Sequence, residues 1–353
     1  MWVASYWEDV PQSGGGLRTH RLIDALRGNG LRVEVVHRGT SGLLGRAVAL
    51  GRRWPLGAAR AWTPALAREV RRRQGGAVVV ADHISAAVVP RLTDRVVVNL
   101  HNVGVAHRDG APSGVRERFD RFLDRQGTKR LEDLVCRSPA RVVVASERDR
   151  AAIGCGLVVP NGTDLPSEVT PANERACVFV GALDYPPNER AVRWWSNEIW
   201  PALPSLVRLE VVGRHGRETL GDMLEHPSVN VVGTVADVGA YVRAAGVVVV
   251  PLQSGGGTRL KILEAIAHGR PVVTTRKGVE GLPLGEAEGV IVVEDDDAVG
   301  FAGAVDRLLH DDAERLRLGD AAAGASTAWS WNAVSAGFVE LVAELAARGS
   351  TRL

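Results

Sequence analysis

The sequence predicts an α/β protein made of two doubly wound, Rossmann-like domains, each built around a parallel sheet. The first observation is length, because 353 residues exceed the usual size of one domain. The second is that short runs of β-branched apolar residues alternate with stretches of helical spacing. The third is that this alternation starts again after a turn-rich stretch, Pro160–Pro171.

The first half of the chain begins with a strand-like run from Trp2 to Tyr6. Helical spacing is clearest at Leu17–Leu26 and Phe119–Val135. Apolar residues at consecutive positions indicate strands buried on both faces, and helices between them indicate a parallel sheet with right-handed crossovers. We therefore expect a first domain over residues 1–162. Its further strands are expected at Val33–Val36, Ala77–Ala81, Val96–Leu100 and Val142–Ala145.

The second half repeats the pattern, which predicts a second domain of the same kind over residues 163–328. A closing helix is expected over residues 329–353, where apolar residues recur at helical spacing from Trp331 to Leu345. The sequence does not reveal what this helix packs against. The strands of the second domain are expected at Cys177–Val180, Leu209–Val212, Val229–Val232, Val247–Pro251, Val272–Thr275 and Val290–Val293.

Composition indicates an ordinary globular protein, with 45% hydrophobic and 24% charged residues. A formal charge of +2 gives no overall field that would attract nucleic acid. Three cysteines without a C-x-x-C pair favour a reducing compartment, so a cytoplasmic location is expected. No apolar run is long enough for a transmembrane segment. The basic stretch Arg52–Arg73 is interpreted as a solvated face, with an anionic acceptor or the inner membrane surface as the alternative.

The segment from Val247 to His268 is the richest in chemistry. It reads as a strand, a glycine loop and a helix, and Gly255, Gly256 and Gly257 leave backbone N–H groups uncovered where the helix begins. The dipole of the helix adds partial positive charge at the same point. This arrangement predicts a site for an anion.

Lys261, Glu264 and His268 are spaced so that they share one face of this helix. A diphosphate needs the cation, and the hydroxyls of a ribose are well held by the carboxylate. The alternative is a solvated polar face with an ion pair inside the helix, which is a common arrangement.

Further motifs stand before and after this helix. The motifs are Ser254–Glu264, His268-Gly-Arg-Pro, Gly278-Val-Glu-Gly-Leu, Pro160-Asn-Gly-Thr-Asp, Phe179-Val-Gly-Ala-Leu-Asp-Tyr-Pro-Pro-Asn and Val231-Val-Gly-Thr-Val-Ala-Asp-Val. Together they resemble the GT4-like, or group 1, retaining glycosyltransferases, in a bacterial branch with the motif G-G-G-T-R-L-K-x-L-E-A. This resemblance implies the GT-B fold, a nucleotide-sugar donor bound by the C-terminal domain, an acceptor bound mainly by the N-terminal domain, and no obligatory metal.

By the same resemblance, Glu264 binds the ribose, and Lys261 with Arg259 and the amides of Gly256, Gly257 and Thr258 holds the diphosphate. The chain departs from the family in two places. Gly256 stands where a second glutamate usually grips the donor sugar, and the usual Arg and Lys pair after the first strand of this domain is missing. Arg214 is a candidate to compensate for that pair. Glu280 faces the cleft or belongs to a plain polar loop.

The N-terminal half repeats the loop-and-helix device at Gly14–Gly16, and Gly15 and Gly16 are predicted to approach the donor phosphates. The alternative is a tight turn that needs glycine for its backbone alone. His101 and Asn102 directly follow a strand, so their side chains are expected at the carboxyl edge of the sheet, where α/β proteins bind ligands. By resemblance, His101 contacts the donor sugar, and we place it with Lys261 as a catalytic candidate. His101 and His107 do not have metal-ligand spacing.

These observations predict a glycosyltransferase that moves a sugar from a nucleotide-diphosphate-sugar, UDP- or GDP-linked, to the hydroxyl of a small molecule, glycan or lipid-linked acceptor. A nucleotide-sugar 2-epimerase on the same fold is the alternative. A dinucleotide-dependent oxidoreductase is disfavoured because its glycine fingerprint is missing. A non-catalytic sugar-binding protein is the remaining reading. No cofactor, metal or nucleic-acid partner is expected, and the sequence does not identify the base, the sugar or the acceptor.

Overall fold

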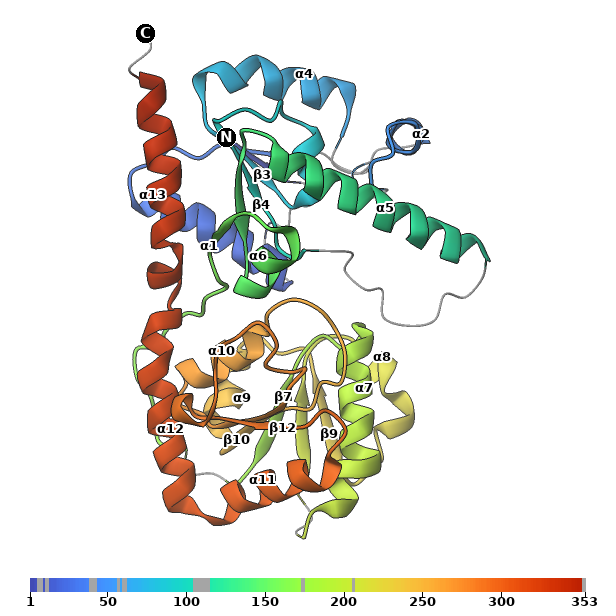
Figure 1. Cartoon of the computed structure of the whole chain (residues 1–353). Coiled ribbons are helices and arrows are strands. Elements are labelled where there is room, and N and C mark those ends of the chain that lie inside the picture. The colour runs from blue at the N-terminus through green and yellow to red at the C-terminus, as the bar shows by residue number, and fades with distance from the viewer. Residues whose placement is uncertain are drawn as a thin grey trace. The chain divides into compact units, whose positions relative to one another are not determined.

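The computed structural model describes residues 1–4, 9, 13–37, 43–55, 58, 62–103, 115–172, 175–204 and 207–350. The chain divides into two compact units (Figure 1). Unit 1 contains Met1–Asn161 and Trp331–Leu353, and unit 2 contains Gly162–Ser330. The expected strand run from Trp2 is described as far as Ala4, and residues 5–8 lie outside the described part of the chain.

Unit 1 is built on a parallel sheet of six strands in the order β2-β1-β3-β4-β5-β6. Its central strands are almost entirely buried, because valine at consecutive positions packs on both faces. The described strands are β1 (Trp2–Ala4), β2 (Val35–His37), β3 (Val79–Asp82), β4 (Val96–Asn99), β5 (Arg141–Val144) and β6 (Leu157–Val158).

Helices pack on both faces of this sheet. On one face α1 (Gly14–Gly28) and the last helix, α13 (Trp331–Ser350), pack through a cluster that includes Leu22, Phe338 and Leu345. The indole of Trp2 meets the ring of Phe338 edge to face at 6.0 Å between centroids. On the other face lie α4 (Pro64–Arg73) and α5 (Val115–Arg137). The remaining described helices of the unit are α2 (Leu43–Gly51) and α6 (Glu147–Ile153).

Unit 2 is a second parallel sheet of six strands, in the order β12-β11-β10-β7-β8-β9, with its own apolar core. The two doubly wound α/β halves expected from the sequence are therefore confirmed. The strands are β7 (Cys177–Val180), β8 (Leu209–Val212), β9 (Val229–Gly233), β10 (Val247–Val250), β11 (Val272–Thr275) and β12 (Val290–Val293). The helices are α7 (Pro186–Trp194), α8 (Gly216–Thr219), α9 (Val238–Ala244), α10 (Leu260–Ala267), α11 (Ala298–His310) and α12 (Asp312–Ser326).

Both sheets contain a point where the winding direction reverses. In unit 1, β1 lies between β2 and β3, so the loops after β1 and β3 leave in opposite directions. In unit 2, β7 lies between β8 and β10 in the same way. Open α/β sheets bind ligands outside the carboxyl ends of the strands at such reversal points. The fold thus marks one location in each unit before any side chain is considered.

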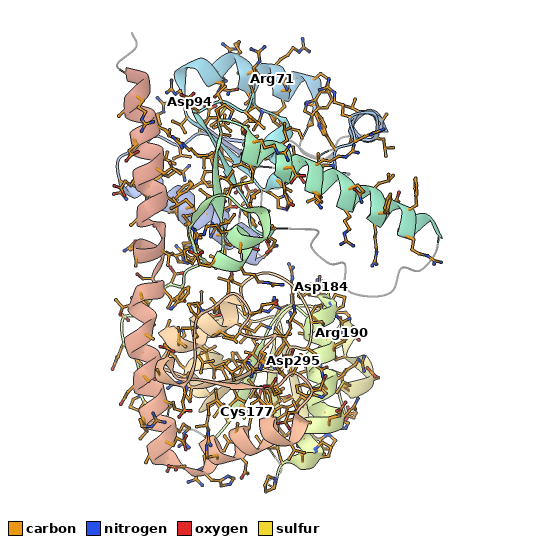
Figure 2. All side chains as sticks on the ribbon, in the orientation of Figure 1. Arg71, Asp94, Cys177, Asp184, Arg190 and Asp295 are labelled. Carbon is orange, nitrogen blue, oxygen red and sulfur yellow. A yellow bond between two sulfur atoms is a disulfide. The ribbon has the colours of Figure 1, made fainter. Side chains whose placement is uncertain are left out.

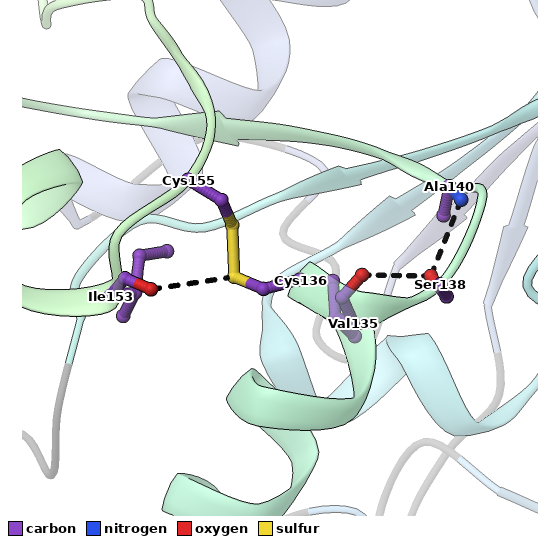
Figure 3. Close-up of a disulfide and its surroundings, with 6 residues drawn as sticks. All are labelled: Val135, Cys136, Ser138, Ala140, Ile153 and Cys155. Atoms are coloured by element: carbon purple, nitrogen blue, oxygen red, sulfur yellow. Dashed lines mark hydrogen bonds between the residues drawn. A yellow bond between two sulfur atoms is a disulfide. The ribbon is translucent and has the colours of Figure 1, made fainter.

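The structure corrects the expectation that the cysteines are unpaired. Cys136, near the end of α5, is joined to Cys155, just before β6, and their Cα atoms lie 5.9 Å apart (Figure 3). The two positions are 19 residues apart in sequence, without C-x-x-C spacing, and the fold of α5 back beside the α6–β6 connection brings them together. Of the cysteines, only Cys177 has a free thiol, buried at the start of β7.

Candidate functional site

The glycine loop of unit 2 lies at the reversal point, between β10 and the start of α10. Gly255 and Gly257 have φ values of +108° and +77°, a backbone region that favours glycine. No side chain caps the start of α10, and its first turn holds no acidic residue. The positive end of the helix dipole is therefore not neutralised within the helix. Arg259 is 6% exposed and donates to the carbonyl oxygens of Gly256 and Gly257, which fixes the shape of the loop.

Lys261 is the cation on the first turn of α10, and two contacts hold its ammonium in place. Nζ donates to Asn188 Oδ1 at 2.8 Å and lies 4.0 Å from the centroid of the Phe179 ring. Burial, and then repulsion from Arg259, lower the pKa of Lys261 well below its ordinary value. The amide oxygen and the aromatic face oppose this effect, because both favour the charged form. An anion bound beside Lys261 would supply the charge that the site lacks.

Glu264 lies one turn further along α10 and is half-buried. Burial, followed by the charges of Asp237 and Asp164, raises its pKa to about 7. The carboxyl group therefore binds a proton readily in the absence of a ligand, and hydrogen bonds from two hydroxyl groups would favour its ionised form.

Three residues at the start of α7 contact the glycine loop or Lys261. The sequence motifs predicted no role for any of them. The hydroxyl of Tyr185 accepts from the Gly256 amide at 3.4 Å, Asn188 holds Lys261, and Arg190 donates to Ser254 Oγ at 2.7 Å. Figure 2 shows Cys177 where β7 starts, and Asp184 and Arg190 toward the opposite end of the strands, where β7 ends. The sequence signal for this cluster is the segment Tyr185-Pro-Pro-Asn188, which begins five positions after the end of β7.

A close approach of backbone and side chain at Gly181 completes this cluster. A Cβ on Gly181 would lie 2.7 Å from Asn188 Nδ2 and 2.9 Å from Lys261 Nζ, so only glycine leaves room for both. A Cβ on Gly256 would meet nothing within 4 Å. The position where relatives are expected to carry a glutamate is therefore open in this chain.

The other predicted residues of unit 2 follow β8 or β11, or flank α10. Arg214 follows β8, and its Nε lies 3.9 Å from Asp184 Oδ1. Glu280 follows β11 and accepts from Lys277 Nζ at 2.7 Å. His268 ends α10, where its Nε2 lies 3.0 Å from the position of a Cβ on Gly239. Gly257 and Thr258 directly precede Arg259, the N-cap residue of α10.

Unit 1 has a polar site at its own reversal point, where α1 begins and β3 and β4 end. The Gly16 amide donates to the N-cap Ser13 at 3.0 Å, so this amide serves the helix start. A Cβ on Gly15 would lie 3.0 Å from His101 Nδ1, which places the glycine loop against the predicted histidine. His101 Nε2 lies 2.9 Å from Asp82 Oδ1. Asn102 is half-buried, directly after His101.

Asp82 belongs to a buried network that the sequence did not predict. Thr19 Oγ1 donates to its Oδ2 at 2.5 Å, and Asn99 Nδ2 donates to its Oδ1 at 2.7 Å. Asn99 in turn accepts from Arg18, whose guanidinium also donates to Asn161. Burial alone would raise the pKa of Asp82, but attraction to the imidazole of His101 when that ring is protonated, together with the hydrogen bonds from His101, Thr19 and Asn99, lowers it to about 2.

The last part of the basic stretch Arg52–Arg73 forms helix α4, which precedes β3. Helix α4 carries its arginines into the connection before β3, and Figure 2 shows Arg71 and Asp94, which precedes β4, in the upper part of unit 1 in that view. Ligands of α/β sheets bind at the carboxyl ends of the strands, so the amino ends of β3 and β4 lie on the opposite side of the sheet from a ligand site. Arg73 pairs with Glu34 and Glu69. These contacts agree with the interpretation of a solvated face, and contact with a membrane surface stays a prediction.

Two doubly wound units, each with a polar site at its reversal point, define a class of α/β proteins that bind ligands at the carboxyl ends of their strands. The sequence assigns the C-terminal part more closely. Residues 174–311 match the family described as "Glycosyl transferases group 1". The resemblance to group 1 glycosyltransferases is therefore confirmed, at the level of the family and over the C-terminal unit.

Individual relatives agree with this family. The phosphatidyl-myo-inositol mannosyltransferase of Mycobacterium leprae is 28% identical over an alignment that covers 56% of this chain and 56% of the relative. The chain thus spans about half the length of the curated relatives it matches.

Among solved structures, sucrose-phosphate synthase from Thermosynechococcus elongatus aligns with a TM-score of 0.70 and 19% identity, over 95% of this chain and 94% of that one. Anabaena HepE in complex with UDP aligns with a TM-score of 0.65 and 15% identity, over 96% and 98%. At these identities the likeness establishes the fold, which is the GT-B fold that the resemblance implied.

Proposed function

We propose that this protein is a glycosyltransferase that moves a sugar from a nucleotide-diphosphate-sugar to an acceptor hydroxyl, with retention and without a metal ion. The observation that carries the proposal is the cluster at the β7–β10 reversal point, where Lys261, the Gly255–Gly257 loop and the uncapped start of α10 come together. An uncapped helix start beside a positioned ammonium is suited to a diphosphate.

In the proposed reaction, the bond between the anomeric carbon and the diphosphate oxygen breaks, and the diphosphate leaves with the electron pair. The acceptor oxygen forms the new bond to the anomeric carbon and loses its proton to the leaving phosphate or to water. Lys261 and the amides of the loop stabilise the negative charge that develops on the diphosphate. Glu264 anchors the ribose, so that the bond that breaks is held in a fixed position. His101 is the candidate of unit 1 for contact with the sugar.

A thermal-shift panel with UDP, GDP, ADP and dTDP tests the sugar-donor site. A ligand that binds the folded state raises the unfolding temperature by mass action. We expect UDP or GDP to stabilise the wild type, and Lys261→Ala and Glu264→Ala to reduce the shift. Arg348→Ala, on the exposed last turn of α13, is the matched control and should respond like the wild type. The assignment fails if no nucleotide stabilises the wild type, or if both site variants keep the full shift.

Retention and metal independence are tested on the transfer itself. The anomeric configuration of the product, measured by NMR coupling constants, should match that of the donor. Activity should persist in excess EDTA. In the described part of the chain, no group of three or more His, Cys, Asp or Glu side chains is arranged to hold a metal ion. Inversion at the anomeric carbon, or loss of activity restored by Mg²⁺ or Mn²⁺, would contradict these two parts of the proposal.

The 2-epimerase alternative predicts a change in the nucleotide-sugar in the absence of an acceptor, and the relatives named above carry no such activity in their names. The acceptor class, whether small molecule, glycan or lipid-linked, is left to an acceptor panel. Cytoplasmic location, with docking at the inner membrane face as its variant, stays a prediction. In the described part of the chain, no helix combines the length and apolarity that a bilayer span requires. The Cys136–Cys155 disulfide removes the argument from unpaired cysteines.

A further inference from the structure

Asp82 is the buried charge of the N-terminal site, and the proposed transfer does not account for it. We propose that Asp82 is a positioning residue: it accepts a hydrogen bond from Nε2–H of His101 and so fixes the imidazole tautomer whose Nδ1 accepts a hydrogen bond from a sugar hydroxyl. This inference rests on the proposed function for its substrate, but its geometric part concerns only the two side chains.

The protonation states follow from the contacts. An ionised carboxylate only accepts hydrogen bonds, and Asp82 is 3% exposed with His101 Nε2 2.9 Å from Oδ1. The proton of a neutral His101 must then lie on Nε2, which leaves Nδ1 as the acceptor. A hydroxyl group of a sugar is a hydrogen-bond donor that suits this nitrogen.

The orientation of Asp82 is fixed from three sides. Its second oxygen, Oδ2, accepts from Thr19 on α1, and Oδ1 also accepts from Asn99 on β4. The parallel register pairs Asp82 directly with Asn99, so the ends of β3 and β4 are held at the same level. A carboxylate with so many partners has little freedom, and a histidine bound to it inherits that orientation.

The Nδ1 side of His101 is kept open by Gly15. Among the described residues, the atoms within 4 Å of a Cβ placed on Gly15 are His101 Nδ1 and Cε1, apart from the chain next to Gly15 itself. On another side the ring of His83 meets that of His101 edge to face, with 6.0 Å between centroids. His83 has a φ of +74°, and a non-glycine residue in that region is typical of functional sites. The imidazole is thus held on Nε2, and its Nδ1 faces the space that a side chain at Gly15 would fill.

A purely structural role for Asp82 is the competing explanation, because the carboxylate also offsets the buried charge of Arg18. The first experiment separates the two without an activity assay. Imidazole-labelled [¹⁵N]histidine protein at about pH 8, where an ordinary histidine is neutral, reports the tautomer through long-range ¹H–¹⁵N correlations. His101→Gln assigns the signal. We expect the Nε2–H tautomer in the wild type and a mixture of tautomers in Asp82→Asn. An unchanged tautomer in Asp82→Asn would overturn the proposal.

The second experiment is a double-mutant cycle on transfer, with the sugar donor that the nucleotide panel selects. Asp82→Asn should lower kcat/KM by roughly 10- to 100-fold, the range found when groups that orient metal-bound histidines are removed. The same change should have little effect in the His101→Ala background, because Asp82 acts through His101. Additive losses would indicate that Asp82 acts only on the fold.

Leu345→Ala is the matched control, because it removes buried packing between α13 and the core of unit 1 and leaves the Asp82–His101 contact in place. It should lower the unfolding temperature through the lost apolar packing while retaining most of kcat/KM. The nucleotide-induced thermal shift of each variant should equal that of the wild type. If the wild type binds nucleotide but catalyses no transfer, the proposed function fails, whereas the tautomer measurement still decides the role of Asp82.

Discussion

At the scale of single residues, Glu264 connects the electrostatics of unit 2 to a pH dependence. Its pKa is about 7 in the folded state and 4.5 is the ordinary value, so the folded protein holds the proton more tightly than the unfolded chain. The stability contributed by the group is full below 4.5 and is lost as pH rises through 7. Hydrogen bonds from ribose hydroxyls would favour the ionised form instead, so binding and stability respond to pH in opposite directions.

We therefore expect the affinity for UDP or GDP to rise with pH and to level off above 7. Below that value the limiting slope is about tenfold per pH unit, because binding must release one proton. Isothermal titration across this range measures the slope. The diphosphate titrates as well, so Glu264→Gln, which keeps the shape and cannot ionise, is the control. A wild-type slope no steeper than that of Glu264→Gln would contradict the claim that Glu264 releases a proton when the nucleotide binds.

Gly15 and Gly28 offer a matched pair of substitutions on helix α1. A methyl group on Gly15 would lie 3.0 Å from His101 Nδ1, whereas a methyl group on Gly28 would meet nothing within 4 Å. Gly15→Ala should lower kcat/KM at least tenfold, because the methyl group covers the nitrogen that is proposed to contact the sugar. Gly28→Ala should leave activity unchanged and stabilise the protein by about 0.4–1 kcal/mol through the unfolded state. Steady-state kinetics and chemical denaturation check both, and full activity of Gly15→Ala would contradict the contact.

At the scale of elements, the buried strands were predictable because continuous runs of valine are typical of strands that are buried on both faces. Strand β7 begins and ends where the apolar run does. The two-residue β6 was missed because Leu157–Val158 is too short to show a pattern. The loop and helix around Lys261 were also predictable, because their residues are contiguous in sequence.

The partners of these residues were not predictable, because they come from other elements. Asn188 and Lys261 are 73 positions apart, and they meet only because β7 and β10 are neighbours in the sheet. Asp82 and His101 likewise meet through the pairing of β3 with β4. A single sequence shows which residues follow a strand, but the strand order decides which of them meet.

The disulfide fastens two elements of unit 1, α5 and the connection before β6. Closing a loop of this size, with the two cysteines 19 positions apart in sequence, restricts the unfolded chain and contributes about 3 kcal/mol. We expect the double variant Cys136→Ser/Cys155→Ser to lower the midpoint of unit 1 in calorimetry and to abolish any effect of dithiothreitol on it. Thiol titration of the denatured protein should find Cys177 alone before reduction. A midpoint unchanged by the double variant would show that the crosslink does not stabilise the unit.

At the scale of the whole molecule, each unit has its own sheet, its own core and its own site. The core of unit 2 is formed by residues between Cys177 and Ala322, and the residues that the proposal assigns to nucleotide binding lie in this unit. Gly15 and Gly16, which the sequence predicts to approach the donor phosphates, lie in unit 1. Ligands and substitutions in the two units should therefore affect different properties. Nucleotide should act on unit 2, whereas substitutions at Asp82 or His101 should act on transfer and leave nucleotide affinity as it is.

The isolated segment 162–330 provides the direct test, because it contains the whole of unit 2. We expect it to fold and to bind UDP or GDP within roughly tenfold of the affinity of the full chain, a difference of about 1.4 kcal/mol. Circular dichroism checks the fold, and titration calorimetry measures the affinity. The same segment with Lys261→Ala is the matched control and should bind more weakly while keeping the same helix content. Because Gly15 and Gly16 are absent from this segment, a folded segment that does not bind would show that unit 1 is required to hold the nucleotide. Binding with the affinity of the full chain would instead show that unit 2 holds the nucleotide without unit 1. Unit 1 would then contribute to contacts with the sugar and the acceptor, as the proposed role of the Asp82–His101 pair requires.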